Sequence, residues 1–153
     1  MPMDELPWTT RWQMLLRTLA PVHNAHGHGQ LLDWLAQPAT PTVVAFANAH
    51  AFNTAAVDHA FFRRLLSADL VLRDGIGMAI LLVLMNQRPG LNLNGTDLIP
   101  RVLRRYAGTS IALFGTADPW LTKAREVVEA RHAPRASFVT AHGFLPTQDY
   151  VRL

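Results

Sequence analysis

The chain reads Ala68-Asp69-Leu70-Val71-Leu72-Arg73-Asp74-Gly75-Ile76-Gly77 at the point that decides its fold. A short apolar run here leads a carboxylate into a glycine turn, and a second apolar segment follows. This pattern predicts a strand that ends at Asp74 and so places the acid at the carboxyl edge of a sheet, where open α/β folds bind ligands. The alternative is that Asp74 only caps the helix that follows.

Segments of strand and helix character alternate along the rest of the chain. Asp118 is the expected N-cap of the last of these helices, with Pro119 in its first position. The alternation predicts an α/β, Rossmann-like fold with a mainly parallel sheet and helices on both faces. Strands are predicted over 42–47, 70–73, 110–114 and 137–141, and helices over 31–36, 49–67, 77–85, from Thr96 or Asp97 onward, and over 120–132.

The composition bounds the class of protein. A chain of 153 residues, half of them apolar, is long enough for one ordinary core. We expect an N-terminal helical lead-in over 1–40 and an α/β domain over 41–153. The absence of cysteine excludes thiol chemistry and disulfides, and it favours a reducing compartment.

The charge and the chain start bear on partners and location. The net charge is +3, and Lys123 is the only lysine among the fourteen cations. An excess of arginine suits a phosphorylated ligand or an anionic membrane surface better than a nucleic-acid track, unless arginine merely replaces lysine throughout. Residues 1–7 lack the pattern of a signal peptide, and the apolar run 78–85 is far shorter than the roughly 20 residues of a spanning helix. We therefore expect a cytoplasmic protein.

Polar groups gather at the ends of the predicted strands, on one rim if the sheet is parallel. They are Asn48 and His50, Asp74, the turn 115–118, and His142-Gly143. The turn 115–118 could bind a phosphate with backbone N–H groups at a helix N-terminus. A tight turn with a helix cap explains the same residues.

Two further groups of side chains invite a ligand. His23, His26 and His28 could bind a metal, but they stand in a glycine-rich turn without a nearby carboxylate or cysteine, so no metal site is predicted. Arg101, Arg104 and Arg105 share a helix face that could meet phosphate, although such a face is often simply solvated.

Five motifs, in order along the chain, resemble the WecG/TagA/CpsF family of bacterial glycosyltransferases. The resemblance extends from Pro41 to Phe144, with a weaker extension over 31–36. The family transfers a sugar from a nucleotide-sugar onto a polyprenyl-pyrophosphate-linked sugar during synthesis of cell-surface polysaccharides. The motifs are Asn48-Ala49-His50, the run 68–77, Asn92-Leu93-Asn94-Gly95-Thr96-Asp97-Leu98, Ile111-Ala112-Leu113-Phe114-Gly115 and Ala141-His142-Gly143-Phe144.

The resemblance implies an inverting transfer with Asp74 as the catalytic base and Asn48 beside it. It implies a UDP-sugar donor, a lipid-linked sugar acceptor, no cofactor and no essential metal, and peripheral association with the inner face of the plasma membrane rather than with nucleic acid. The residues expected to bind substrate are Asn48, His50, Gly75, Gly77, Asn94, Gly95, Asp97, Gly115, Thr116 and His142.

The sequence also departs from the family pattern. Phe46 stands where the teichoic-acid members have threonine, and Asn92 stands where they have arginine. The motif 92–98 is more similar to the exopolysaccharide branch, which implies a hexose donor such as UDP-glucose rather than UDP-N-acetylmannosamine. The family continues beyond the His-Gly-Phe motif into further α/β structure and a basic, membrane-docking segment, so we expect a truncated relative.

Other classes of function stay open at this stage. A non-catalytic nucleotide-binding α/β module would share the fold, and an inactive truncated relative would share the motifs as well. An unpaired sheet edge would favour assembly into a homo-oligomer.

Overall fold

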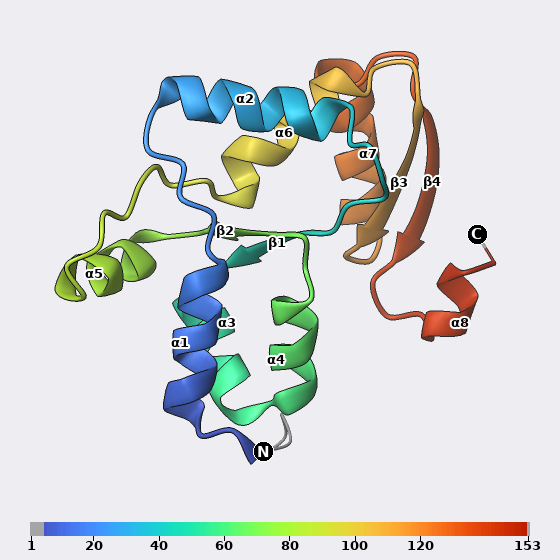
Figure 1. Cartoon of the computed structure of the whole chain (residues 1–153). Coiled ribbons are helices and arrows are strands. Elements are labelled where there is room, and N and C mark those ends of the chain that lie inside the picture. The colour runs from blue at the N-terminus through green and yellow to red at the C-terminus, as the bar shows by residue number, and fades with distance from the viewer. Residues whose placement is uncertain (1–4, 153) are drawn as a thin grey trace. The chain divides into compact units, whose positions relative to one another are not determined.

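The computed structural model describes residues 5–152 and confirms the predicted α/β class (Figure 1). The chain forms two compact units, Met1–Asp97 and Leu98–Leu153. The assignment of 41–153 to a glycosyltransferase domain stays a prediction. No helix within residues 5–152 has both the length and the hydropathy needed to cross a membrane.

A parallel pair of short strands forms the centre of the first unit. Strands β1 (Val44–Ala47) and β2 (Leu70–Arg73) run side by side, in a register that pairs Val44 with Leu70 and Ala47 with Arg73. On its other side β2 accepts a hydrogen bond at Val71 O from Ala20 N, 2.9 Å away. The chain after the first helix therefore lies along β2.

Five helices belong to this unit: α1 (Trp8–Thr18), α2 (Ala25–Ala36), α3 (Ala49–Val57), α4 (His59–Leu66) and α5 (Ile76–Leu84). The prediction of a single helix over 49–67 is wrong. The helix breaks at Asp58, whose extended backbone ends α3 and whose side chain accepts from Phe61 N at 2.9 Å. Asp is a favourable N-cap residue. Its local hydrogen bond therefore ends one helix and starts the next, although the apolar pattern continues across it.

The prediction for α2 is also too short. The helix begins at Ala25 because the Asn24 side chain caps it, accepting from Gly27 N at 2.9 Å. His26 and His28 therefore lie on a helix and not in a glycine-rich turn.

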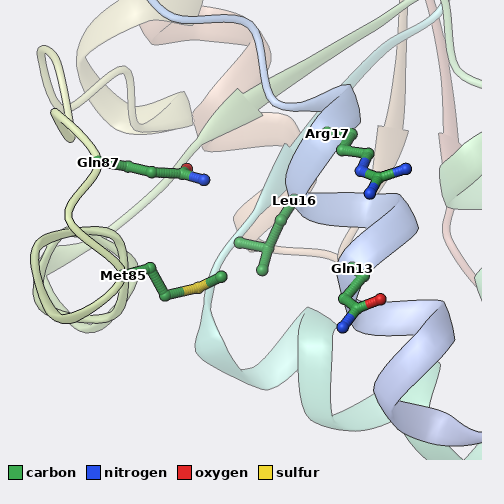
Figure 2. A pocket seen from close by; sticks show the side chains of 5 residues that line it. All are labelled: Gln13, Leu16, Arg17, Met85 and Gln87. Atoms are coloured by element: carbon green, nitrogen blue, oxygen red, sulfur yellow. The ribbon is translucent and has the colours of Figure 1, made fainter.

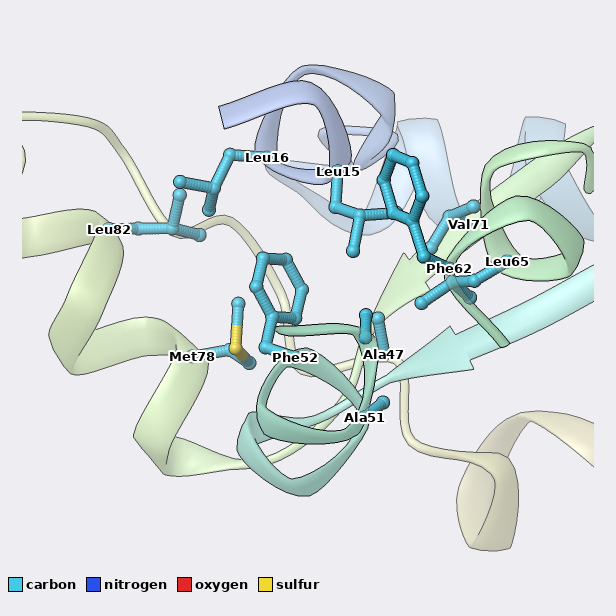
Figure 3. Packing of buried hydrophobic residues seen from close by; sticks show 11 residues of the cluster. Leu15, Leu16, Ala47, Ala51, Phe52, Phe62, Leu65, Val71, Met78 and Leu82 are labelled. Carbon is cyan, nitrogen blue, oxygen red and sulfur yellow. The ribbon is translucent and has the colours of Figure 1, made fainter. Parts of the chain in front are cut away.

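Four helices of the first unit, α1, α3, α4 and α5, pack around one apolar core (Figure 3). Phe52 and Phe62 are its largest fully buried side chains, and Met78 of α5 packs against Phe52. Trp12 of α1 meets the Phe52 ring edge to face and donates its indole N–H to Phe52 O at 2.8 Å. The core thus packs α1, α3, α4 and α5 against β1 and β2.

The second unit contains another parallel pair. Strands β3 (Ser110–Gly115) and β4 (Ser137–His142) pair from Ser110–Ser137 to Gly115–His142. The helices here are α7 (Trp120–Arg131) and α8 (Thr147–Tyr150), while α6 (Gly95–Arg105) crosses the boundary between the units. Within residues 5–152 the four named strands thus form two two-stranded sheets rather than one continuous sheet.

The predicted start of α7 at Trp120 is confirmed, but its N-cap differs from the prediction by one position. Pro119 lies at the N-cap, and the helix begins at Trp120. The Asp118 carboxylate nevertheless binds the first turn, accepting from Thr122 N at 3.1 Å and from Thr122 Oγ1 at 2.7 Å.

Candidate functional site

The carboxyl edge of β1 and β2 brings the two principal predicted residues together. Ala47 pairs with Arg73, so Asn48 and Asp74 are the next residues of neighbouring strands. Asp74 N donates to Ala47 O at 3.0 Å, which extends the ladder by one step. Parallel pairing therefore sets the Asp74 backbone beside Asn48, as the strand-end pattern predicted.

The Asp74 side chain is half-buried at this edge. Its carboxylate makes no hydrogen bond or ion pair with any part of the chain that the structure describes. The alternative that Asp74 caps α5 is wrong, because Gly75 holds the N-cap position and no side chain bonds the first turn. The carboxylate is thus available to a ligand.

Two glycines shape the turn after Asp74. Gly75 has a φ of 84°, in the left-handed region that a Cβ disfavours. Its N–H donates to Asn92 Oδ1 at 2.8 Å. A Cβ on Gly77 would approach the Ala49 Cβ to 3.3 Å, so the first turns of α3 and α5 pass close to each other. Both helix N-termini begin at the edge that holds Asp74.

Replacing Gly75 with Ala should lower the free energy of unfolding by about 1 kcal/mol or more, because Ala must adopt a positive φ. The space around Gly75 is open, so a steric clash contributes nothing. Gly29 is the matched control, since it lies in α2 with open space around it and an ordinary helical backbone. Gly29→Ala should stabilise the chain by about 0.4–1 kcal/mol. Urea denaturation of both variants checks the pair, and equal effects would contradict the strain at Gly75.

Arg73 is a site residue that the sequence reasoning missed. Its side chain is 6% exposed, and its guanidinium donates to three backbone carbonyls. Nε binds Pro89 O at 2.8 Å, Nη1 binds Gly75 O at 2.9 Å and Nη2 binds Gly90 O at 3.2 Å. Burial lowers the pKa of Arg73 from its ordinary value, and the Asp74 carboxylate partly opposes that shift. The signal was an arginine at the end of an apolar strand, where a buried cation needs partners.

The loop after α5 is held against the end of β2 by further contacts. Leu93 N donates to Arg73 O at 3.2 Å, next to the bond between Asn92 and Gly75. Together with the Arg73 guanidinium, these bonds tie residues 89–93 to the turn that carries Asp74.

The motif residues at the start of α6 are engaged with one another. Asn94 Oδ1 accepts from Asp97 N at 2.8 Å, and Asn94 Nδ2 donates to Asp97 Oδ2 at 2.9 Å. This reciprocal pair caps the helix that begins at Gly95. A substrate-binding role for these three residues stays a prediction.

The residues predicted from the first strand end lie on α3. Asn48 caps that helix, accepting at Oδ1 from Ala51 N at 2.9 Å. His50 is exposed in the first turn, and its backbone oxygen accepts from Thr54 Oγ1. Both therefore lie at the same strand edge as Asp74.

The remaining predicted residues lie in the second unit, at the carboxyl edge of β3 and β4. Gly115 O accepts from Gly143 N, and a Cβ on Gly143 would meet the Gly115 backbone. His142 is exposed, and its backbone oxygen accepts from Tyr150 Oη at 2.7 Å. The prediction of one rim is corrected here: because the strands pair within each unit, there are two edges. The role of Thr116 stays a prediction.

In the turn 115–118, a carboxylate of the chain itself occupies the start of α7. The Asp118 carboxylate takes the donors of Thr122 at the start of α7, the place foreseen for a phosphate. A tight turn with a helix cap, the alternative weighed from the sequence, accounts for this contact.

The remaining two candidate groups are the arginines of α6 and the histidines near the start of α2. Arg101 and Arg104 are exposed on α6, which also carries Arg105. Across residues 5–152, no three His, Cys, Asp or Glu side chains are grouped closely enough to hold a metal ion.

A comparison with protein-family models agrees with the family that the motifs resemble. A comparison with curated protein sequences found no match. The family model described as glycosyl transferase WecG/TagA/CpsF family matches residues 18–152, which is most of the chain. Its members are glycosyltransferases of cell-surface polysaccharide synthesis. The chain belongs to the WecG/TagA/CpsF family of glycosyltransferases.

Proposed function

We propose that this protein moves a sugar from a UDP-sugar to a polyprenyl-pyrophosphate-linked sugar, with inversion at the anomeric carbon and Asp74 as the general base. The observation that carries the proposal is the half-buried Asp74 carboxylate, which lies at a strand edge with no partner among residues 5–152. The proposal extends the family's general activity to one residue and one reaction.

The proposed step needs a single carboxylate. Asp74 takes the proton of the acceptor hydroxyl while the oxygen of that hydroxyl attacks the anomeric carbon. The bond from that carbon to the donor diphosphate breaks on the opposite face, and UDP leaves with the electron pair. A base held within hydrogen-bond reach of the hydroxyl is sufficient, and no covalent sugar intermediate forms.

The negative charge that builds on the departing diphosphate needs donors nearby. The first turn of α5 supports this role, because its N–H groups have no side-chain cap and begin directly after Asp74 and Gly75. The positive end of a helix dipole favours such an anion. In α3 the Asn48 side chain already takes one N–H of the first turn, so α5 is the better donor.

The finer assignments follow the motifs. The exopolysaccharide-like motif 92–98 supports a hexose donor such as UDP-glucose. A lipid-linked acceptor places the reaction at the cytoplasmic face of the plasma membrane, with the protein bound peripherally. In this reading Asn48, His50 and the loop that begins at Asn92 surround the sugars.

Titration calorimetry with UDP, UDP-glucose and UDP-N-acetylmannosamine tests the donor. We expect binding of UDP and UDP-glucose, with UDP competing against the sugar nucleotide for one site. Transfer is then followed by release of UDP in the presence of a lipid-linked sugar acceptor. Binding without transfer would favour a non-catalytic nucleotide-binding module. A lack of binding to all three would contradict the proposal.

A further inference from the structure

The chain between α1 and α2 runs parallel to β2 toward the edge that holds Asp74. Leu19 forms a parallel bridge with Val71, and the backbone N–H of the next residue donates to Val71 O at 2.9 Å. Three residues beyond this bridge β2 reaches Asp74, and the parallel chain reaches the residue before His23. Since parallel segments end at one edge of a sheet, His23 lies at the same edge as Asn48 and Asp74.

The loop after α5 connects His23 with the turn that carries Asp74. Leu91 N donates to Val22 O, directly before His23, at 2.7 Å. Leu93 N donates to the carbonyl directly before Asp74 at 3.2 Å. The loop therefore lies between the two chain segments, and two strand spacings set the His23 and Asp74 backbones about 10 Å apart. A sugar diphosphate held at Asp74 is long enough to cover that distance.

Gly90 brings this loop close to the His23 side chain. It has a φ of 65°, in the left-handed region that favours glycine. A Cβ at this position would approach Val22 O to 2.6 Å and His23 Nδ1 to 3.4 Å. Gly90 O also accepts from Arg73 Nη2 at 3.2 Å. The loop beside His23 is thus held by the same arginine that holds the turn at Gly75.

The His23 side chain is exposed and makes no hydrogen bond or ion pair with any residue of 5–152. An imidazole donates a hydrogen bond from a ring nitrogen in its neutral form as well as in its charged form. Neither residues 6–32 nor residues 75–96 contain Asp or Glu, so these segments offer His23 no carboxylate as a partner. Its ring is therefore available to an anionic ligand.

We propose that His23 is a further substrate-binding residue, which donates a hydrogen bond to a diphosphate of one of the two substrates. This inference rests on the proposed function, in which both the sugar nucleotide and the lipid-linked acceptor carry a diphosphate. Hydrogen bonds to phosphate oxygens are among the stronger ones, because the acceptor is charged. His23 binds the diphosphate on one side of the loop 90–93, while Asp74 acts on the hydroxyl at the other.

The start of the same loop lies against α1 and offers a control position (Figure 2). A hollow of about 420 Å³ there is lined by Gln13, Leu16, Arg17, Met85 and Gln87. Leu16 and Met85 point toward each other across it, and Gln87 extends toward α1. Neither His23 nor Asp74 lines this hollow. A change at Gln87 therefore tests whether altering the loop alone affects substrate binding.

Calorimetry with UDP and the full chain tests the donor diphosphate. His23→Leu should weaken UDP binding about tenfold, because one hydrogen bond to a charged group is lost. His23→Arg keeps a donor and should bind UDP within about threefold of wild type. His26→Leu is the matched control, since His26 is exposed on α2, five positions from the buried Leu31 and so on another face. His26→Leu and Gln87→Leu should bind UDP like the wild type.

Transfer assays test the acceptor diphosphate with the same variants. If His23 binds the acceptor, His23→Leu should bind UDP like the wild type but raise the KM for the lipid-linked sugar about tenfold. His23→Arg should again stay close to wild type. Either pattern supports the proposal and assigns the diphosphate to one substrate. Circular dichroism should show that every variant is folded.

Two results would overturn the role of His23. One is a folded His23→Leu variant with unchanged UDP affinity and unchanged acceptor KM. The other is an equal loss of affinity in His23→Leu and His23→Arg, which would mark a structural residue. The proposed function fails separately, if the wild-type chain neither binds a UDP-sugar nor transfers sugar. Full activity of His23→Leu beside an inactive Asp74→Asn would sink the His23 proposal alone.

Discussion

Asp74→Asn should lower the rate of sugar transfer by about two to four orders of magnitude while donor binding stays within a few-fold of wild type. The amide keeps the shape of the side chain but cannot take a proton from the acceptor hydroxyl, and a positioned base contributes about 10²–10⁴-fold to such a step. The carboxylate has no protein partner within residues 5–152, so its replacement should leave the fold intact.

The measurement combines UDP release under saturating acceptor with calorimetry of the donor. Glu126→Gln is the control, because it makes the same carboxylate-to-amide change at an exposed position of α7. It should keep full activity. Transfer by Asp74→Asn at the wild-type rate would remove the base from the mechanism, and it would leave a nucleotide-binding module as the better account.

Arg73→Met should lower the free energy of unfolding by about 3 kcal/mol and weaken donor binding as well. Methionine keeps the apolar stem of the side chain but leaves the carbonyls of Gly75, Pro89 and Gly90 without their donor. Hydrogen bonds from a charged donor contribute about 1.5–3 kcal/mol each, and three that share one guanidinium do not add fully. The turn at Gly75 would lose one of its two anchors.

Urea denaturation measures the stability effect, with Arg64→Met as the control because that arginine is exposed on α4. The control should change stability by less than about 0.5 kcal/mol. Arg73→Lys separates charge from geometry, since a lysine keeps the cation but cannot reach three carbonyls with a planar fork. Stability of Arg73→Met equal to wild type would show that the loop is held by other contacts.

Much of the fold could be predicted from spacing along the chain. All four named strands lie within two residues of their predicted bounds, because β-branched or apolar runs bounded by turn residues are a local signal. The position of Asp74 at a strand end followed from the same signal. The errors also have local causes: Asp58 and Asn24 cap helices where the apolar pattern alone did not indicate an end or a start.

The amino-acid sequence by itself determined the α/β class, the strand ends that carry Asn48 and Asp74, and the family, since each depends on residues close together in the chain. Only the tertiary structure decided how the strands pair and which polar groups meet. Within residues 5–152 the named strands form two separate sheets, and the Asp74 carboxylate makes no hydrogen bond or ion pair. Arg73 joins the loop at Pro89 and Gly90 to the turn at Gly75. Those outcomes depend on tertiary contacts between polar groups. Arg73 lies 16 and 17 positions from Pro89 and Gly90, and such a spacing in the sequence does not indicate that the residues are in contact.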